Sequence, residues 1–138
     1  MSFGVINMKL ASETAIVTGS TSGIGKKLAE LLLREGANVV ISSRSEERVK
    51  ETVDEFKTEF GDAVIGITCD VSDPASVNNL VNQTMDVFGR IEILIANAGV
   101  NTVYGPFELL SQDEIASHAQ TMIGTNLLGT INSIYSVL

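Results

Sequence analysis

The chain has no tryptophan, and aromatic residues make up only 5% of its 138 residues. So few rings argue against a surface that stacks nucleic-acid bases. Basic residues are also scarce: nine Lys and Arg stand against 17 Asp and Glu, a formal net charge of −8. Nucleic-acid binding by counterion release needs a basic excess, so this composition gives no reason to expect such a partner.

Long apolar runs and paired cysteines are missing as well. No run of 18 apolar residues occurs, so no membrane-spanning helix is expected, and the first ten residues are too short and mixed for a secretory signal. Cys69 is the single cysteine and His118 the single histidine, too few for an internal disulfide or a metal ligand set. A reducing, cytoplasmic location is therefore expected, with no metal.

Apolar residues are nevertheless plentiful, at 44% of the chain. That fraction excludes an acidic disordered chain and is enough for a hydrophobic core. The length fits one domain, which we predict over residues 1–138.

Short β-branched runs alternate with segments of helical periodicity. The expected strands are Thr14–Thr18, Asn38–Ser42, Ala63–Thr68 and Ile91–Ile95. Three helices should follow the first three strands, and a fourth should begin at the capping box of Ser111 and run to the end of the chain. This alternation predicts an α/β fold, a doubly wound parallel sheet with helices on both faces.

Helical spacing also predicts which side chains face the sheet. The expected inner residues are Ile24, Leu28, Leu31 and Leu32 in the first helix, Val49, Val53, Phe56 and Phe60 in the second, and Val77, Leu80, Val81, Met85 and Phe88 in the third.

A glycine-rich loop joins the first strand to the first helix. Gly19 permits a sharp exit from the strand, Gly23 lets the backbone approach a pyrophosphate, and Gly25 lets the helix pack closely. Free amides at a helix N-terminus favour an anion. We therefore predict a dinucleotide site rather than a flexible surface loop. Its loop residues are Gly19, Ser20, Thr21, Ser22, Gly23, Ile24 and Gly25.

The spacing T-G-x-x-x-G-x-G resembles the glycine signature of the short-chain dehydrogenase/reductase family. Three further motifs follow in that family's order: Cys69-Asp70-Val71, Asn97-Ala98-Gly99 and Asn126-Leu127-Leu128-Gly129. The resemblance implies a Rossmann-like sheet with strand order 3-2-1-4, of which the family's later strands are not in this sequence. It also implies cofactor contacts by Asp70, Val71, Asn97, Ala98 and Gly99.

The end of the second strand bears on the choice of cofactor. Folds that prefer NAD usually carry an acid there, which binds the ribose 2′-hydroxyl. Here Ser43 and Arg44 occupy the position, and an arginine can pair with a 2′-phosphate. We predict NADP(H) over NAD(H), the alternative being that Arg44 is simply a solvated residue before a helix.

The resemblance also implies hydride transfer between a nicotinamide and a carbonyl or secondary alcohol as small-molecule substrate. Family members use a serine, a Tyr-x-x-x-Lys unit and an asparagine. Only Asn126 can be assigned as a catalytic residue, because neither Tyr104 nor Tyr135 is followed by a lysine four positions on. His118 is interpreted as a packing or surface residue.

Several alternatives stay open at this point. The sequence could be part of a longer enzyme, or a short protein that binds nucleotide without catalysis. A methyltransferase is a third alternative, although that class generally has an acidic residue at the position of Ser43. From residue 115 onward no side chain carries a formal charge. A pattern that is apolar on one face and uncharged on the other is typical of a buried helix. We therefore predict that the protein forms a homo-oligomer through this C-terminal helix.

Overall fold

Four parallel strands form a single sheet in the computed structural model, which describes residues 9–138. The strands are β1 (Thr14–Thr18), β2 (Asn38–Ser43), β3 (Val64–Thr68) and β4 (Ile93–Ile95). Their order is β3-β2-β1-β4, which confirms the predicted topology. The domain predicted over residues 1–138 includes residues 1–8, which lie outside the described residues.

The two edge strands are shorter than predicted. A 3-10 turn, Gly61–Ala63, takes up the residue expected to begin β3. Next to β4, the N–H of Glu92 donates to the carbonyl of Thr14 at 3.0 Å, and the Glu92 carboxylate accepts from the N–H of Thr14 at 2.8 Å. The strand β4 itself begins at Ile93, two residues later than predicted.

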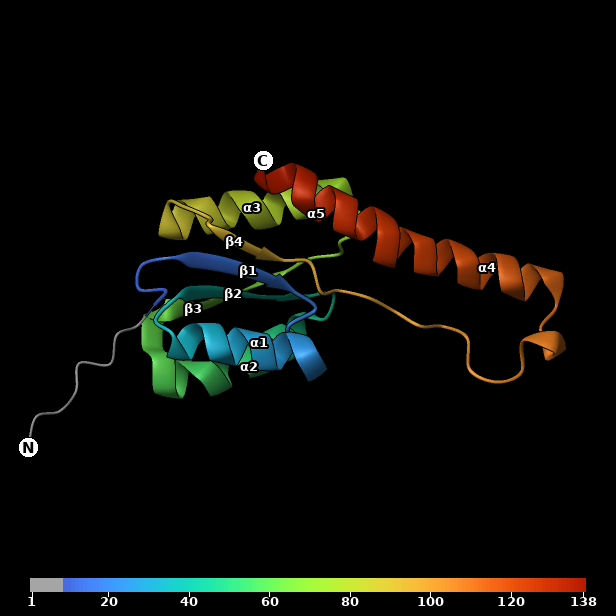
Figure 1. Ribbon diagram of the computed structural model, residues 1–138, viewed down its shortest axis with the longest axis horizontal. Coiled ribbons are helices and arrows are strands. Elements are labelled where there is room, and N and C mark those ends of the chain that lie inside the picture. The colour runs from blue at the N-terminus through green and yellow to red at the C-terminus, as the bar shows by residue number, and fades with distance from the viewer. Residues whose placement is uncertain (1–8) are drawn as a thin grey trace, which may run out of the picture.

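Helices cover both faces of the sheet (Figure 1). The elements α1 (Gly23–Arg34) and α2 (Glu46–Phe60) lie on one face, and α3 (Pro74–Phe88) and α5 (Gly129–Val137) on the other. Sequence-local signals fix their ends: the Asp73 side chain accepts from the N–H of Ala75 ahead of Pro74, and Gly89 ends α3 in the left-handed conformation. The doubly wound arrangement is confirmed.

The core accordingly has two halves, one on each side of the sheet. One half joins the sheet to α1 and α2: Ala15, Val17, Ala29, Leu33, Ala37, Val39, Ile41, Val49, Val53, Phe56 and Val64. The other joins it to α3 through Ile16, Val40, Ile67, Cys69, Val71, Val77 and Leu80. The strands read as continuous apolar runs because both of their faces are buried.

The predicted inner face of α1 is wrong at two of its four residues, whereas Leu32 packs against the core as predicted. Ile24 is 76% exposed and Leu31 47% exposed, while Gly25, Ala29 and Leu33 are buried. The close approach of Gly25 to the loop before it sets the rotation of this helix, and small residues fill the narrow space beneath. In α3 the prediction fails only at Met85, which is 44% exposed.

The C-terminal helix runs in three parts. After the capping box of Ser111 come α4 (Gln112–Met122), a π-helical segment (Ile123–Leu128) and α5. Figure 1 shows α4 extending well beyond the sheet, and α4 has no buried residue. None of the helices among residues 9–138 combines the length and apolarity needed to cross a membrane.

The buried side of this helix is its small and polar side. Thr125, Gly129 and Ser133 are buried, and a Cβ on Gly129 would lie only 2.5 Å from Cγ2 of Val71. The opposite side, which we call the apolar face, is about half exposed. It consists of Ile123, Leu127, Leu128, Ile131 and Ile134. The burial expected for these apolar residues is therefore not provided by the described chain.

Candidate nucleotide site

The glycine loop and the segment after β4 are locked together at the carboxyl end of the sheet. The amide Nδ2 of Asn97 donates to the carbonyl oxygens of Thr18 (3.0 Å) and Gly19 (3.2 Å). The hydroxyl of Thr18 accepts from the backbone N–H groups of Asn97 (3.1 Å) and Ala98 (3.0 Å). Four hydrogen bonds thus fix the loop position relative to β4, so the site is largely pre-formed.

Two glycines of the loop leave no room for a side chain. Gly19 has a φ of +67°, and a Cβ there would lie 2.9 Å from the Cα of Ala98. A Cβ on Gly25 would collide with Nδ2 of Asn97 and lie 2.5 Å from the carbonyl oxygen of Gly19. Because these neighbours are backbone atoms or a side chain with fixed partners, they cannot move aside cheaply.

The side chain of Ser20 holds the glycine loop in place. It is fully buried, its hydroxyl donates to the carbonyl of Val17 at 2.6 Å, and the same oxygen accepts from the N–H of Ser42 at 2.9 Å. These contacts tie the glycine loop to β2 and engage the hydroxyl as both donor and acceptor.

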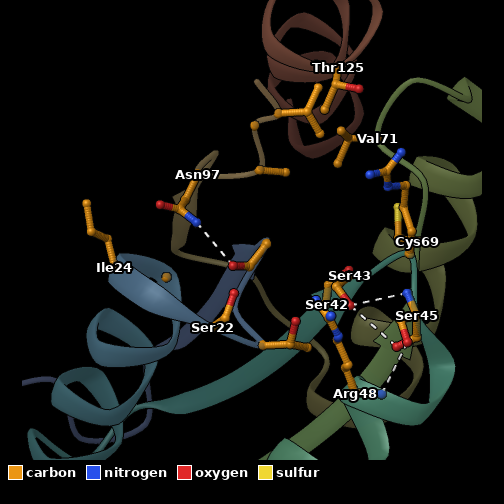
Figure 2. A pocket seen from close by; sticks show the side chains of 17 residues that line it. Ser22, Ile24, Ser42, Ser43, Ser45, Arg48, Cys69, Val71, Asn97 and Thr125 are labelled. Atoms are coloured by element: carbon orange, nitrogen blue, oxygen red, sulfur yellow. Dashed lines mark hydrogen bonds between the residues drawn. The ribbon is translucent and has the colours of Figure 1, made fainter. Parts of the chain in front are cut away.

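A cavity of about 410 Å³ opens over this loop (Figure 2). That volume lies in the range of small-molecule sites. Eleven of the residues predicted as cofactor contacts line it: Gly19, Thr21, Ser22, Ile24, Gly25, Ser43, Arg44, Val71, Asn97, Ala98 and Gly99. Ser20, Gly23 and Asp70 do not line it, and neither does Asn126.

Hydroxyl and guanidinium groups gather in the cavity wall at the end of β2. The Ser43 hydroxyl accepts from the N–H of Ser45 at 3.3 Å, and Ser45 caps α2 by accepting from the N–H of Arg48. The hydroxyl oxygen of Ser42 is fully buried next to the thiol of Cys69 and does not face the cavity.

Asp70 lies beside the cavity and is held by its own turn. Its carboxylate accepts from the hydroxyl of Ser72 (2.7 Å) and from the Ser72 N–H (2.9 Å). These hydrogen bonds, with a smaller contribution from the charge of Arg44, lower the pKa of Asp70. Next to it, burial raises the pKa of the Cys69 thiol, so this cysteine is held in its neutral form.

Asn126 lies in the π-helical segment and contacts the chain just past Gly99. Its Oδ1 accepts from the N–H of Val100 at 2.8 Å, and its Nδ2 donates to the carbonyl of Val100 at 2.9 Å. Both ends of the side-chain amide are thereby used. The catalytic role implied by the motif stays a prediction, and the contacts that Asn126 makes in this structure are positioning contacts.

Strand order 3-2-1-4, the glycine loop after β1 and a cavity at the carboxyl ends of the strands define a Rossmann-like α/β fold. The sequence model of the short chain dehydrogenase family matches residues 13–138. The chain belongs to this family.

Individual relatives agree with that assignment. The chain is 40% identical over 123 residues to a (2S)-[(R)-hydroxy(phenyl)methyl]succinyl-CoA dehydrogenase subunit of Thauera aromatica, covering 89% of this chain and 47% of that protein. The chain therefore spans less than half the length of this curated relative.

Two solved structures superpose closely. The 3-ketoacyl-(acyl-carrier-protein) reductase of Brucella melitensis, complexed with NADH, gives a TM-score of 0.80 at 28% identity, covering 94% of this chain and 50% of that one. An alcohol dehydrogenase of Thermococcus sibiricus, complexed with 5-hydroxy-NADP, gives 0.77 at 30% identity, covering 91% and 51%.

Sequence reasoning did not single out part of the cavity wall as contacts. These residues are Ser42, Ser45, Arg48, Cys69, Val100 and Thr125. Of these residues, Arg48 could have been predicted from the sequence. It lies one helical turn after the cap Ser45, and therefore at the same end of α2 as Arg44. Thr125 could not be found from spacing, because the π-helical segment changes which side chains face the sheet.

Proposed function

We propose that this chain is the cofactor-binding part of an NADP(H)-dependent oxidoreductase, which interconverts a carbonyl compound and the corresponding secondary alcohol. The observation that carries the proposal is the cavity itself: a pre-formed glycine cradle at one end and two arginines at the other, Arg44 and Arg48.

The residues fit a dinucleotide. The missing side chains at Gly19 and Gly25 keep the loop tight, and the N-terminus of α1 supplies positive backbone dipole for a pyrophosphate. Structural relatives from Brucella and Thermococcus carry NADH and 5-hydroxy-NADP, which supports a nicotinamide cofactor for this chain.

The preference for NADP(H) rests on the end of β2. The wall there presents Ser43 and Arg44, and no carboxylate lines the cavity where folds that prefer NAD carry one. A charge-assisted hydrogen bond from a guanidinium contributes about 1.5–3 kcal/mol, or roughly ten- to a hundredfold in affinity.

A bound nicotinamide would supply the hydride or accept it. The chain's own residues provide binding and orientation: Asn97 holds the glycine loop, and Asn126 holds Val100 beside the motif Asn97-Ala98-Gly99. Tyr104 and Tyr135 are 85% and 80% exposed and lie outside the cavity, so we assign the proton-transfer step to neither. Catalysis is proposed for a protein of the relatives' full length.

A second candidate is a nucleotide-binding module without turnover. It is favoured by the same two tyrosines, which are exposed and lie outside the cavity. A fluorescence change of NADPH on binding, without its consumption over a broad set of carbonyl compounds, would support this module instead of the enzyme.

We also propose that the protein assembles as a homo-oligomer through the apolar face of the C-terminal helix. Five large apolar side chains lie about half exposed along it, a contiguous arrangement that monomeric proteins usually avoid. A cytoplasmic location is proposed from the single free cysteine, Cys69.

Arg44→Ala tests the cofactor proposal. It should weaken NADPH binding at least tenfold and leave NADH binding within about twofold, because only NADPH carries the 2′-phosphate. Lys57→Ala, an exposed charge in the last turn of α2, is the control and should change neither affinity. Gly19→Val should abolish both by filling the cradle. Equal losses for both cofactors in Arg44→Ala, or no loss, would overturn the NADP(H) assignment.

A further inference from the structure

The two arginines of the cavity differ from most other cations of the chain in having no acid partner. Acids outnumber bases by 17 to nine, and six ion pairs within residues 9–138 engage Lys26, Lys27, Arg34, Lys50 and Arg90. Within the same residues neither Arg44 nor Arg48 has a carboxylate at ion-pair distance, although three glutamates lie close in sequence. Those glutamates are Glu46, Glu47 and Glu51.

The backbone between the two arginines is held rigidly. The Ser43 hydroxyl accepts from the N–H of Ser45 (3.3 Å) and donates to its carbonyl (3.4 Å), and the Ser45 hydroxyl accepts from the N–H of Arg48 (3.3 Å). These three hydrogen bonds fix the start of α2 against the end of β2. Arg48 therefore starts from a defined position, one helical turn past the cap.

The two guanidinium groups approach the cavity from different sides. Figure 2 shows the Arg48 side chain extending from α2 toward Ser42 and Ser43. Arg44 is close enough to Asp70, at the end of β3, for its charge to act on that carboxylate. The end of the cavity therefore has one unpaired cation on the α2 side and another toward β3.

We propose that Arg48 is a second cationic contact for the cofactor's 2′-phosphate, opposite Arg44. This inference rests on the proposed NADP(H) function and deepens it. A phosphate dianion has three acceptor oxygens and can bind two guanidinium groups at once. The acids Glu46 and Glu47 occupy the first turn of α2, so the helix N-terminus alone is a weak anion site and the two side chains carry the discrimination.

The test is a cofactor titration of the chain and its Arg48→Ala variant. NADPH affinity should fall about tenfold, the effect of one lost charge-assisted hydrogen bond, and NADH affinity should stay within about twofold. Arg48→Lys should keep part of the NADPH affinity, because it retains the charge but not the planar donor pair. Lys50→Ala is the matched control: it lies on the same helix, pairs with Asp54 and does not line the cavity, so it should bind both cofactors as the parent does.

The possible failures are distinguishable. If the parent chain prefers NADPH and Arg44→Ala removes that preference while Arg48→Ala keeps all of it, the Arg48 contact is overturned and the proposed function stands. If Arg48→Ala weakens NADPH and NADH equally, Arg48 only supports the fold, which also overturns the contact. If the parent chain binds NADH as tightly as NADPH, the proposed cofactor preference itself is overturned.

Discussion

Replacing Gly25 by alanine tests whether the loop and α1 are packed as tightly as the structure indicates. The added Cβ would collide with Nδ2 of Asn97 and lie 2.5 Å from the carbonyl oxygen of Gly19. Alanine is otherwise the better helix residue, so on helix propensity alone this change would stabilise the protein by about 0.5–1 kcal/mol. The two effects have opposite signs, which makes the experiment decisive.

The steric effect should prevail. Overpacking typically costs about 1–3 kcal/mol. The Asn97 amide would also have to leave one or both of its carbonyl partners, on Thr18 and Gly19, at about 1 kcal/mol for each hydrogen bond. After subtracting the gain in helix propensity, we expect a net loss of about 2 kcal/mol in the free energy of unfolding. At about 2 kcal/mol per molar urea, the unfolding midpoint should fall by roughly 1 M.

Gly124→Ala is the matched control, because Gly124 also lies in a helical segment but a Cβ there would meet only the Cβ of Ser72, at 4.0 Å. That variant should be as stable as the parent or slightly more stable. A Gly25→Ala protein that is also unchanged or stabilised would refute the close packing of the loop.

Three further predictions concern the surroundings of the cavity. Asn126→Ala removes both hydrogen bonds to Val100, so hydrogen exchange of the Val100 amide should become at least tenfold faster, at about 1–3 kcal/mol for the lost pair. The pKa of Asp70 is lowered in the folded state by the Ser72 hydrogen bonds, so its ionised form stabilises the fold above the unfolded-state pKa, and this contribution is lost as the pH falls through the lowered folded-state value. The difference in unfolding free energy between the parent and Asp70→Asn should therefore be constant near neutral pH and shrink below about pH 4; a difference that is flat down to pH 2 would contradict it. Ile131→Glu places a charge on the apolar face and should lower the mass measured by sedimentation, and a parent chain that is already monomeric would contradict the oligomer proposal.

Much of the fold could be predicted because its signals are local. The caps at Ser45, Asp73 and Ser111 lie where the sequence indicates, and the strands are apolar runs bounded by turn residues. The alternation of strands and helices then leaves few topologies, since parallel crossovers are right-handed. The order β3-β2-β1-β4 follows from the family motifs rather than from periodicity.

The failures come from tertiary contacts that periodicity does not contain. Periodicity put Ile24 and Leu31 inside, but the steric limit at Gly25 rotates α1 so that Ala29 and Leu33 face the sheet. In the C-terminal helix the small residues Gly129 and Ser133 are buried instead of the apolar ones, because Val71 fits into the gap at Gly129.

In the candidate site, too, the parts that depend on local sequence could be predicted and the parts that depend on tertiary packing could not. The glycine loop and the motif Asn97-Ala98-Gly99 could be predicted, because glycine and asparagine at those positions satisfy backbone requirements that few other residues meet. Thr125 lines the cavity only because the π-helical segment returns to it from elsewhere in the fold. Its part in the site depends on how the elements pack, which the spacing of residues along the chain does not encode.

We expect the cavity over the glycine loop to bind a dinucleotide and to prefer the form with a 2′-phosphate. This expectation can be tested by equilibrium titration of the chain with NADPH, NADH and S-adenosylmethionine. Binding of NADPH should be saturable and at least tenfold tighter than that of NADH, and S-adenosylmethionine should not bind. Binding of S-adenosylmethionine without either nicotinamide cofactor, or equal affinity for NADPH and NADH, would contradict it.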